Sequence, residues 1–174
     1  ATGVYKIKPL KEASAVVAGN LFVNPSFEFS VEAGQMTGGS GGAGGKGATL
    51  MPDTRVAFDG ETSLRLHNPF PDAGAVRGLF PIDNESDRTY ILSVWARTDQ
   101  RTLDLHRAKG TKLTFKLALG SLGEKEFELT DTAWTRFLMV CPPQEYKRTH
   151  HGGAAGSITL RGEGTVWFDL VQIT

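Results

Sequence analysis

The sequence predicts an all-β fold, a β-sandwich jelly roll built from two antiparallel sheets. Three observations lead to this prediction. Apolar and polar residues alternate along most of the chain, turn-forming residues separate the alternating stretches, and no stretch has a convincing helical pattern longer than two turns. With 174 residues, the chain has the size of one domain and can bury a sizeable core.

The alternation is clearest in four stretches of the chain. They read TSLRLHN at 62–68, TYILSVWART at 89–98, KLTFKLAL at 112–119 and GSITLRG at 156–162. Successive side chains of a strand point to opposite faces, so a half-buried antiparallel strand alternates apolar and polar residues. We therefore predict four such strands, whose apolar rows are Leu64 and Leu66; Tyr90, Leu92, Val94 and Ala96; Leu113, Phe115, Leu117 and Leu119; and Ile158 and Leu160.

Turn-forming residues fall between these strands. We predict turns at FDGE, NPFPDAG, DNESD, HRAKG, GSLGE, HHGG and RGEG. The nearest approach to a helix is PLKEASAVVAG at 9–19, which lacks a clean apolar stripe. We expect one β-sandwich domain over residues 20–174, preceded by a lead-in strand or linker over residues 1–19.

Composition gives no support to several classes of partner. Lys and Arg together number 19, as do Asp and Glu, so the net charge gives no reason to expect binding to nucleic acid or to an acidic membrane. No apolar run approaches the length that spans a bilayer. Cys141 is the single cysteine, so no internal disulfide can form, and we expect a small buried hydrophobic side chain rather than a nucleophile.

A glycine-rich stretch, TGGSGGAGGKG at 37–47, invites comparison with phosphate-binding loops. It contains a G-x-G-x-x-G pattern at Gly39, Gly41 and Gly44, and it ends in Gly-Lys-Gly. A phosphate loop needs Ser or Thr after the lysine and then a helix, whereas a glycine and a β-branched stretch containing Pro52 follow here. We predict a flexible loop.

Five stretches give the chain a family resemblance. They are NLFVNPSFE at 20–28, VAFDGETSLRL at 56–66, TYILSVWART at 89–98, TAWTRFLMV at 132–140 and GTVWFDLVQI at 164–173. Over residues 20–174, these resemble the carbohydrate-binding modules of the family 4 and 9 type, galactose-binding-like jelly rolls attached to secreted polysaccharide-degrading enzymes. The resemblance implies two facing antiparallel sheets, a structural calcium ion, sugar binding on a concave sheet face or at loop ends, and a secreted, cell-surface or periplasmic location. Such modules often carry a Gly-Trp pair after the opening motif, where this chain has its glycine-rich stretch.

The resemblance also implies the calcium ligands. Glu28 and Asp169 would supply side chains from the first and last strands, and the backbone carbonyls of Asp59 and Thr62 would complete much of the shell. Calcium binds hard oxygen ligands of this kind, and an ion at this place would pin chain ends that otherwise fray. The alternative is that Glu28 and Asp169 are ordinary carboxylates at strand ends.

The candidate sugar site centres on Trp95. Its parity is opposite to that of the apolar row, so its side chain should project from the other face, next to Arg97. A sugar ring stacks its apolar face on an aromatic plane while polar neighbours bind its hydroxyls. Trp134 is a third candidate, although its strand is apolar on both parities and its facing is open; Trp167 shares parity with Asp169, which predicts packing beside the metal.

Further cations lie on the outward rows of other strands. If Arg65, His67, Lys112, Lys116 and Arg161 shared the face of Trp95, that face would suit an acidic polysaccharide. The alternative is a tryptophan buried under a loop, with cations that only solvate the surface.

Catalysis has little support in the sequence. There is no G-x-S-x-G or H-E-x-x-H motif, and the row of Glu124, Glu126 and Glu128 is typical of a solvated strand face. The first hypothesis is a noncatalytic module that binds a polysaccharide or oligosaccharide, with an adjoining catalytic domain as a further partner. The second is a structural jelly roll that packs against a catalytic domain without binding sugar. A hydrolase or lyase in its own right is the third.

Overall fold

The structure, a computed structural model, describes residues 30–31, 35–36, 48–71, 75–82, 88–120, 122–143 and 154–174. Within these ranges it contains eleven strands and one helix, α1 (Gln100–Lys109). The strands are β1 (Ser30–Val31), β2 (Gln35–Met36), β3 (Thr49–Asp53), β4 (Ser63–Asn68), β5 (Ala75–Ile82), β6 (Tyr90–Thr98), β7 (Thr114–Leu119), β8 (Gly123–Glu128), β9 (Thr135–Cys141), β10 (Ala154–Arg161) and β11 (Gly164–Ile173).

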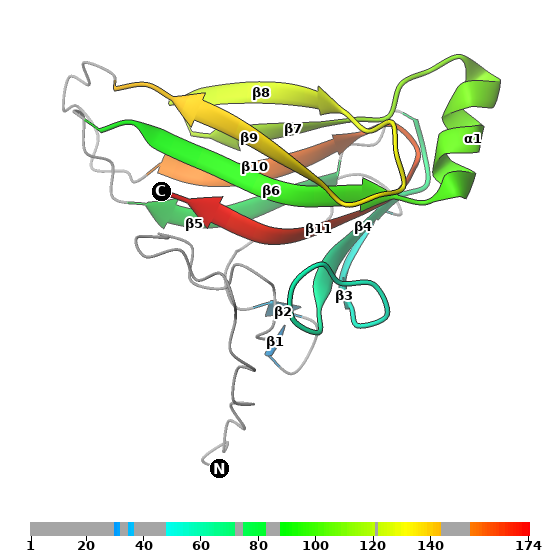
Figure 1. Cartoon of the computed structure of the whole chain (residues 1–174), viewed down its shortest axis with the longest axis horizontal. Coiled ribbons are helices and arrows are strands. Elements are labelled where there is room, and N and C mark those ends of the chain that lie inside the picture. Colours follow the sequence, from blue (N-terminus) through cyan, green and yellow to red (C-terminus); the bar gives the residue numbers. More distant parts are fainter. Residues whose placement is uncertain are drawn as a thin grey trace, which may run out of the picture.

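Most of these strands form two antiparallel sheets that lie face to face (Figure 1). The five-stranded sheet has the order β3-β4-β11-β6-β9, and the four-stranded sheet has the order β5-β10-β7-β8. A third, two-stranded sheet pairs β1 with β2. The predicted all-β sandwich of two antiparallel sheets is confirmed. Every strand predicted from alternation is present, as β4, β6, β7 and β10.

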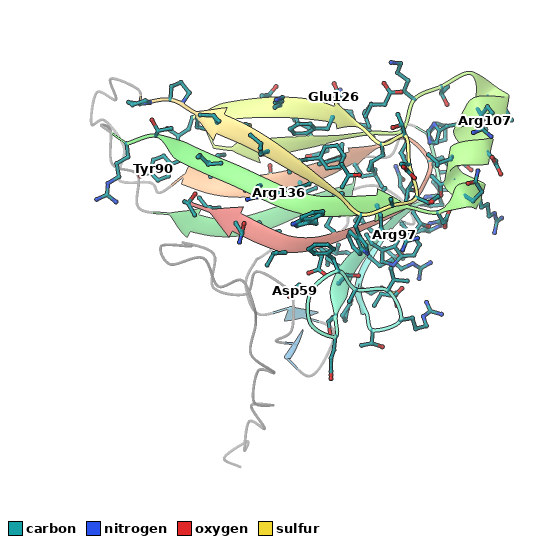
Figure 2. The ribbon with its side chains drawn as sticks, in the orientation of Figure 1. Asp59, Tyr90, Arg97, Arg107, Glu126 and Arg136 are labelled. Atoms are coloured by element: carbon teal, nitrogen blue, oxygen red, sulfur yellow. The ribbon has the colours of Figure 1, made fainter. Side chains whose placement is uncertain are left out.

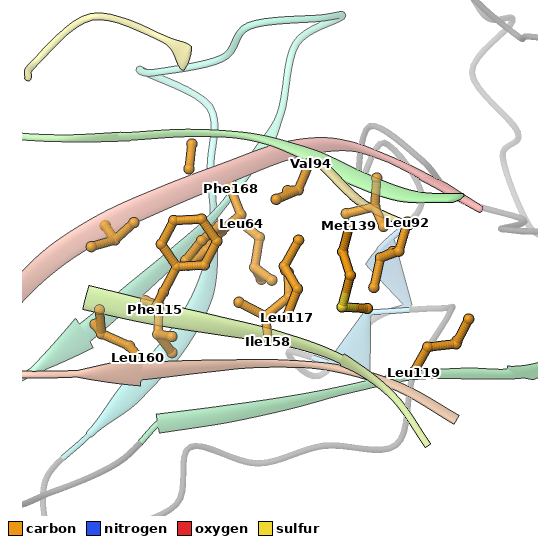
Figure 3. Close-up of a cluster of buried hydrophobic side chains, with 14 of the residues drawn as sticks. Leu64, Leu92, Val94, Phe115, Leu117, Leu119, Met139, Ile158, Leu160 and Phe168 are labelled. Atoms are coloured by element: carbon orange, nitrogen blue, oxygen red, sulfur yellow. The ribbon is translucent and has the colours of Figure 1, made fainter. Parts of the chain in front are cut away.

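The core lies between the two large sheets. Leu64, Leu92, Val94 and Phe168 approach it from the five-stranded sheet, and Phe115, Leu117, Ile158 and Leu160 approach it from the four-stranded sheet (Figure 3). All of these side chains are fully buried, and each such burial stabilises the fold by about 1.5–3 kcal/mol. Cys141 is also fully buried within this core, which confirms its prediction as a small hydrophobic side chain, and burial raises the pKa of its thiol.

Helix α1 corrects two predictions, that no helix exceeds two turns and that HRAKG at 106–110 is a turn. Its ten residues make nearly three turns. Asp99 caps the N-terminus by accepting a hydrogen bond from the Thr102 N–H, and Gly110 ends the helix in the left-handed conformation. The helix was missed because its buried residues, Thr102 and His106, are polar, so no apolar stripe marks it.

Polar contacts dock α1 against the turn between β10 and β11. The Thr165 N–H donates to Thr102 Oγ1 at 3.1 Å, and His106 Nε2 donates to the Glu163 carbonyl at 2.8 Å. Gly164, at the start of β11, lies so close that an added Cβ would meet Thr102 Cγ2 at 2.2 Å. The helix therefore covers one end of the sandwich (Figure 1).

Several predictions concern residues that the structure does not describe. The lead-in at 1–19, the opening motif at 20–28, which includes Glu28, and the glycine-rich stretch at 37–47 all lie outside the described ranges. Among the residues that the structure does describe, no helix has the length and apolarity needed to cross a membrane.

Candidate functional site

The outer face of the five-stranded sheet carries the predicted sugar-site residues. On β6, Trp95 and Arg97 project away from the core because the alternate residues Val94 and Ala96 are fully buried in it. Strand β11 lies beside β6 and pairs Asp169 with Trp95 and Trp167 with Arg97. Strand order, which the sequence left open, thus places the predicted metal ligand directly next to the predicted sugar platform.

Three aromatic side chains form a cluster on this face, made of Phe58, Trp95 and Trp134. Phe58 stacks on Trp95, with ring centroids 4.0 Å apart and planes inclined by 18°. It also meets the Trp134 ring at 5.9 Å in a tilted arrangement. Trp95 and Trp134 are half-buried, whereas Phe58 is 40% exposed. The loop between β3 and β4 therefore covers one face of Trp95 and offers the ring of Phe58 to solvent.

Phe58 was not among the predicted site residues. It lies within the FDGET turn, which was considered only for the backbone oxygens of Asp59 and Thr62. The signal that could have identified it is a large aromatic residue in a turn. Strand alternation does not assign such a residue to the core, so its ring can lie on the surface.

Arg97, which is labelled in Figure 2, lies near two indole rings. Its guanidinium carbon is 5.9 Å from the centroid of Trp134 and 6.0 Å from that of Trp167, within the range of cation–π attraction. On the far side of β11, Arg65 of β4 is the direct neighbour of Trp167. Arg65, Trp167 and Arg97 thus form one row across three strands, which we call the arginine row.

Trp167 is fixed by a buried carboxylate at the edge strand. Its indole Nε1 donates to Asp53 Oδ2 at 3.0 Å, and Asp53 Oδ1 accepts from the backbone and side chain of Arg55. Burial alone would raise the pKa of Asp53, but the hydrogen bonds from Arg55 and Trp167 outweigh it and lower the pKa to about 2. The acid is therefore ionised at neutral pH, and its hydrogen bond holds the indole of Trp167 in place beside Arg97.

Asp169 is fully buried and is the direct cross-strand neighbour of Trp95. Its Oδ2 accepts from the Phe58 N–H at 2.7 Å and the Asp59 N–H at 3.1 Å, and its Oδ1 accepts from the Leu170 N–H at 2.7 Å. Burial raises the pKa of Asp169 to about 7 in spite of these three hydrogen bonds. The carboxylate therefore anchors the loop that carries Phe58.

The predicted calcium ligands are brought together in part. Asp169 contacts the turn that contains Asp59 and Thr62, as the resemblance implies, while Glu28 lies outside the described residues. The turn presents two N–H groups to Asp169 Oδ2, which leaves Oδ1, with one N–H partner, as the oxygen free to bind a cation. The described ranges hold no group of three or more His, Cys, Asp or Glu that could bind a metal. Calcium thus stays a prediction that depends on Glu28.

The five further cations do not share one face. Arg65 and His67 lie on β4, on the face of Trp95, and His67 Nδ1 contacts Thr165 Oγ1 at 2.9 Å. Lys116 on β7 and Arg161 on β10 belong to the four-stranded sheet, and Lys112 pairs with Glu128 of that sheet. The condition for a single cationic face is therefore met only by the β4 residues.

The outer face of the four-stranded sheet is charge-balanced. Lys112 contacts Glu128 at 2.6 Å, Lys116 contacts Glu124 at 2.8 Å, and the Thr114 hydroxyl donates to Glu126 at 2.7 Å. These acids are exposed and take part in cross-strand pairs, which agrees with their prediction as a solvated row.

A scan of protein-family models and a search of curated proteins return no match. Solved structures do resemble the chain. A family 16 carbohydrate-binding module superposes with a TM-score of 0.56 at 14% identity, covering 89% of this chain and 99% of that one. A family 61 module solved with β-1,4-galactotriose, TmCBM61, gives a TM-score of 0.55 at 14% identity and covers 89% and 97% of the two chains.

A third resemblance is to part of a larger protein. The enzymatically active domain of tailspike protein 4 from bacteriophage CBA120 gives a TM-score of 0.60 at 17% identity and covers 88% of this chain. This chain spans only 21% of that one. At these identities the likenesses establish the fold, which is that of carbohydrate-binding modules of several families.

Proposed function

We propose that this domain is a noncatalytic carbohydrate-binding module that binds a polysaccharide on the outer face of its five-stranded sheet. Phe58 and Trp134 offer ring surfaces for stacking, Trp95 supports the ring of Phe58 from beneath, and Arg97 binds hydroxyl or acidic groups beside them. The observation that carries the proposal is the aromatic cluster itself. Phe58, which is 40% exposed, stacks on Trp95 and also meets the ring of Trp134 at the outer face of the five-stranded sheet, in a fold shared with a module solved with a bound galactotriose.

The family 4 and 9 type is the finer proposal, and the sequence motifs support it. The same proposal includes a secreted, cell-surface or periplasmic location and a covalently adjoining catalytic domain. The adjoining domain is supported by the phage tailspike, in which the similar fold is one part of a longer chain. A structural calcium ion belongs to the same proposal. Asp169 and the carbonyls of Asp59 and Thr62 would hold it with Glu28, and the ion would stabilise the fold and take no part in chemistry.

Affinity electrophoresis in gels that contain soluble polysaccharides tests the binding proposal. The wild-type protein should be retarded by at least one neutral or acidic polysaccharide, and Trp95→Ala should abolish the retardation. Loss of one stacking platform costs on the order of 1–3 kcal/mol, enough to take a weak sugar complex below detection. Val140→Ala is the matched control. Val140 is 54% exposed on the same sheet but pairs with Ile91, four positions along β6 from Trp95. If no polysaccharide retards the wild-type protein, the proposed sugar binding is wrong.

A second function, packing against a catalytic domain without binding sugar, is favoured by one other observation. Ile91, Leu138 and Val140 are 40%, 46% and 54% exposed, and they lie together on adjacent register positions of β6 and β9. A strip of this kind is typical of a protein contact surface. If this second function holds in place of sugar binding, Leu138→Asp should disrupt association with a neighbouring domain while Trp95→Ala leaves it unchanged.

A further inference from the structure

The two arginines of the arginine row differ from Lys112 and Lys116 in their partners. On the four-stranded sheet, Lys112 and Lys116 each contact a glutamate. On the five-stranded sheet, the acids nearest the row are already bound: Asp53 to Arg55 and Trp167, and Asp169 to backbone N–H groups. Within the described residues, neither Arg65 nor Arg97 has a carboxylate partner.

The hydrogen bonds of these guanidiniums are also incomplete. The Nε atoms of Arg65 and Arg97 are buried and have no hydrogen-bond partner among the described residues. Among the described residues, the one polar contact of Arg65 is from its Nη1 to the Met51 thioether at 3.8 Å, and the Arg97 guanidinium lies over the rings of Trp134 and Trp167. Two neighbouring cations with unused donors are unusual in a folded protein, where buried polar groups are nearly always paired.

The register of the row places the two arginines on either side of one tryptophan, and the Arg97 guanidinium lies over its ring. Trp167 pairs directly with Arg65 on one side and Arg97 on the other, so the two Cα atoms are two strand spacings, about 10 Å, apart. Two arginine side chains at this separation can both reach one bound group. The guanidinium of Arg97 already lies near two indole rings, which limits the rotamers that a bound anion must fix.

We propose that Arg65 and Arg97 bind the carboxylate or sulfate groups of an acidic polysaccharide. The inference rests on the proposed function and names its substrate class. A guanidinium binds a planar or tetrahedral anion through two parallel N–H bonds, and it does so more strongly than a neutral donor. The sugar rings stack on the aromatic cluster, and their acidic substituents lie over Trp167. Charge complementarity selects this ligand, because the face offers two arginines that have no carboxylate partner among the described residues.

The test measures dissociation constants for three polymers at one ionic strength. These are a neutral β-1,4-galactan, a polygalacturonate that carries carboxylates, and a dextran sulfate. The wild-type protein should bind an acidic polymer more tightly than the galactan, and the preference should fade as salt rises. Arg65→Gln should weaken acidic binding by about tenfold to a hundredfold and leave galactan binding within about twofold. Arg97→Gln should weaken acidic binding by the same factor and galactan binding by less, because Arg97 also contacts hydroxyl groups in the proposed site.

Two further variants control for charge and for geometry. Arg101→Gln removes the same net charge from an exposed position on α1 and should leave all three affinities unchanged. Arg97→Lys keeps the charge but loses the forked geometry, so it should recover only part of the acidic affinity. Circular dichroism and urea unfolding check that each variant is folded.

The outcomes separate the two levels of the argument. Equal affinity for galactan and acidic polymers, with no effect of Arg65→Gln or Arg97→Gln, overturns this inference and leaves the proposed function standing. No binding to any polymer overturns both. Binding to single-stranded DNA that exceeds binding to every polysaccharide would overturn the choice of ligand, since arginines beside aromatic rings also suit nucleic acid. Preference for dextran sulfate over polygalacturonate, or the reverse, identifies the acidic group.

Discussion

Phe58 lies flat on Trp95, and its backbone N–H donates to the buried carboxylate of Asp169, the direct cross-strand neighbour of that same tryptophan. One loop residue thus connects the predicted metal ligand to the predicted sugar platform. Asp169 thus helps to hold the loop between β3 and β4 over Trp95. Changes at Asp169 should therefore reach the aromatic cluster as well as the stability of the fold.

The exposed ring of Phe58 should contribute to sugar binding more than to stability. Phe58→Ala removes a stacking surface that is 40% exposed, so we expect about tenfold weaker polysaccharide binding and a loss of unfolding free energy below about 1 kcal/mol. Titration calorimetry and urea unfolding measure the two quantities. Phe70→Ala is the control, because Phe70 is 52% exposed outside the cluster. Unchanged affinity in Phe58→Ala would remove Phe58 from the site.

Asp169 should make the melting temperature fall as pH rises in the absence of calcium, and should make the stabilisation by calcium increase as pH rises. Burial raises its pKa to about 7, whereas an unfolded aspartate titrates near about 3.9. Between these values the folded state holds a proton that the unfolded state has lost, so without metal this group's contribution to stability falls as pH rises from about 4 to about 7. Calcium binds the ionised form, so its stabilising effect should increase as pH rises through about 7.

Thermal melts at pH 5 and pH 8, in calcium and in chelator at matched ionic strength, check this prediction. In chelator the protein should melt higher at pH 5, and Asp169→Asn should remove this trend. The gain from calcium should be larger at pH 8, and both Glu28→Ala and Asp169→Ala should abolish it. Identical melts at pH 8 with calcium and with chelator would disprove the metal proposal.

The Asp53–Trp167 hydrogen bond should stabilise the fold only above acidic pH. The hydrogen bonds of Asp53 lower its pKa to about 2, so the stability that they contribute is present above about pH 4 and is lost as pH falls towards about 2. Trp167→Phe removes the indole donor and should cost about 1.5–3 kcal/mol at pH 7, because the acceptor is charged.

Urea unfolding at pH 7, 4 and 2.5 measures this contribution. The difference between Trp167→Phe and wild type should shrink as the pH is lowered. Asp104→Asn is the control: Asp104 is an exposed residue of α1 that accepts from Gln100 and Arg107, and its loss should change stability little. A Trp167→Phe deficit that is the same at every pH would show that packing, and not the carboxylate, is responsible.

The centre of the core should be the most sensitive position in the fold. Phe115 is fully buried, and its ring meets those of Phe127, Phe137 and Phe168 at centroid distances of 5.5, 5.0 and 5.3 Å. Phe115→Ala should lower the unfolding free energy by about 3–5 kcal/mol. Val140→Ala, at an exposed position of β9, should stay within about 0.5 kcal/mol. Similar losses for the two variants would contradict the assigned core.

The sequence by itself determined which side chains face the core. Leu64, Leu92, Leu117 and Ile158 were assigned inward from alternation alone, and all four are fully buried. This succeeds because the strand repeat is local: each residue's face follows from its neighbours two positions away, whatever strand pairs beside it. The same reasoning failed for α1, since a helix that buries Thr102 and His106 leaves no apolar period in the sequence.

The tertiary structure alone decided what shares a face. Strand β11 lies between β4 and β6, and this order places Trp167 between Arg65 and Arg97, places Asp169 beside Trp95, and separates Lys116 and Arg161 onto the opposite sheet. Residues that contact one another on this face are far apart along the chain: Trp167 follows Asp53 by 114 positions, and Asp169 follows Phe58 by 111. Alternation fixes only the side of its own strand to which a residue points. Which strands pair depends on how both sheets pack around the common core, and that is a property of the whole chain.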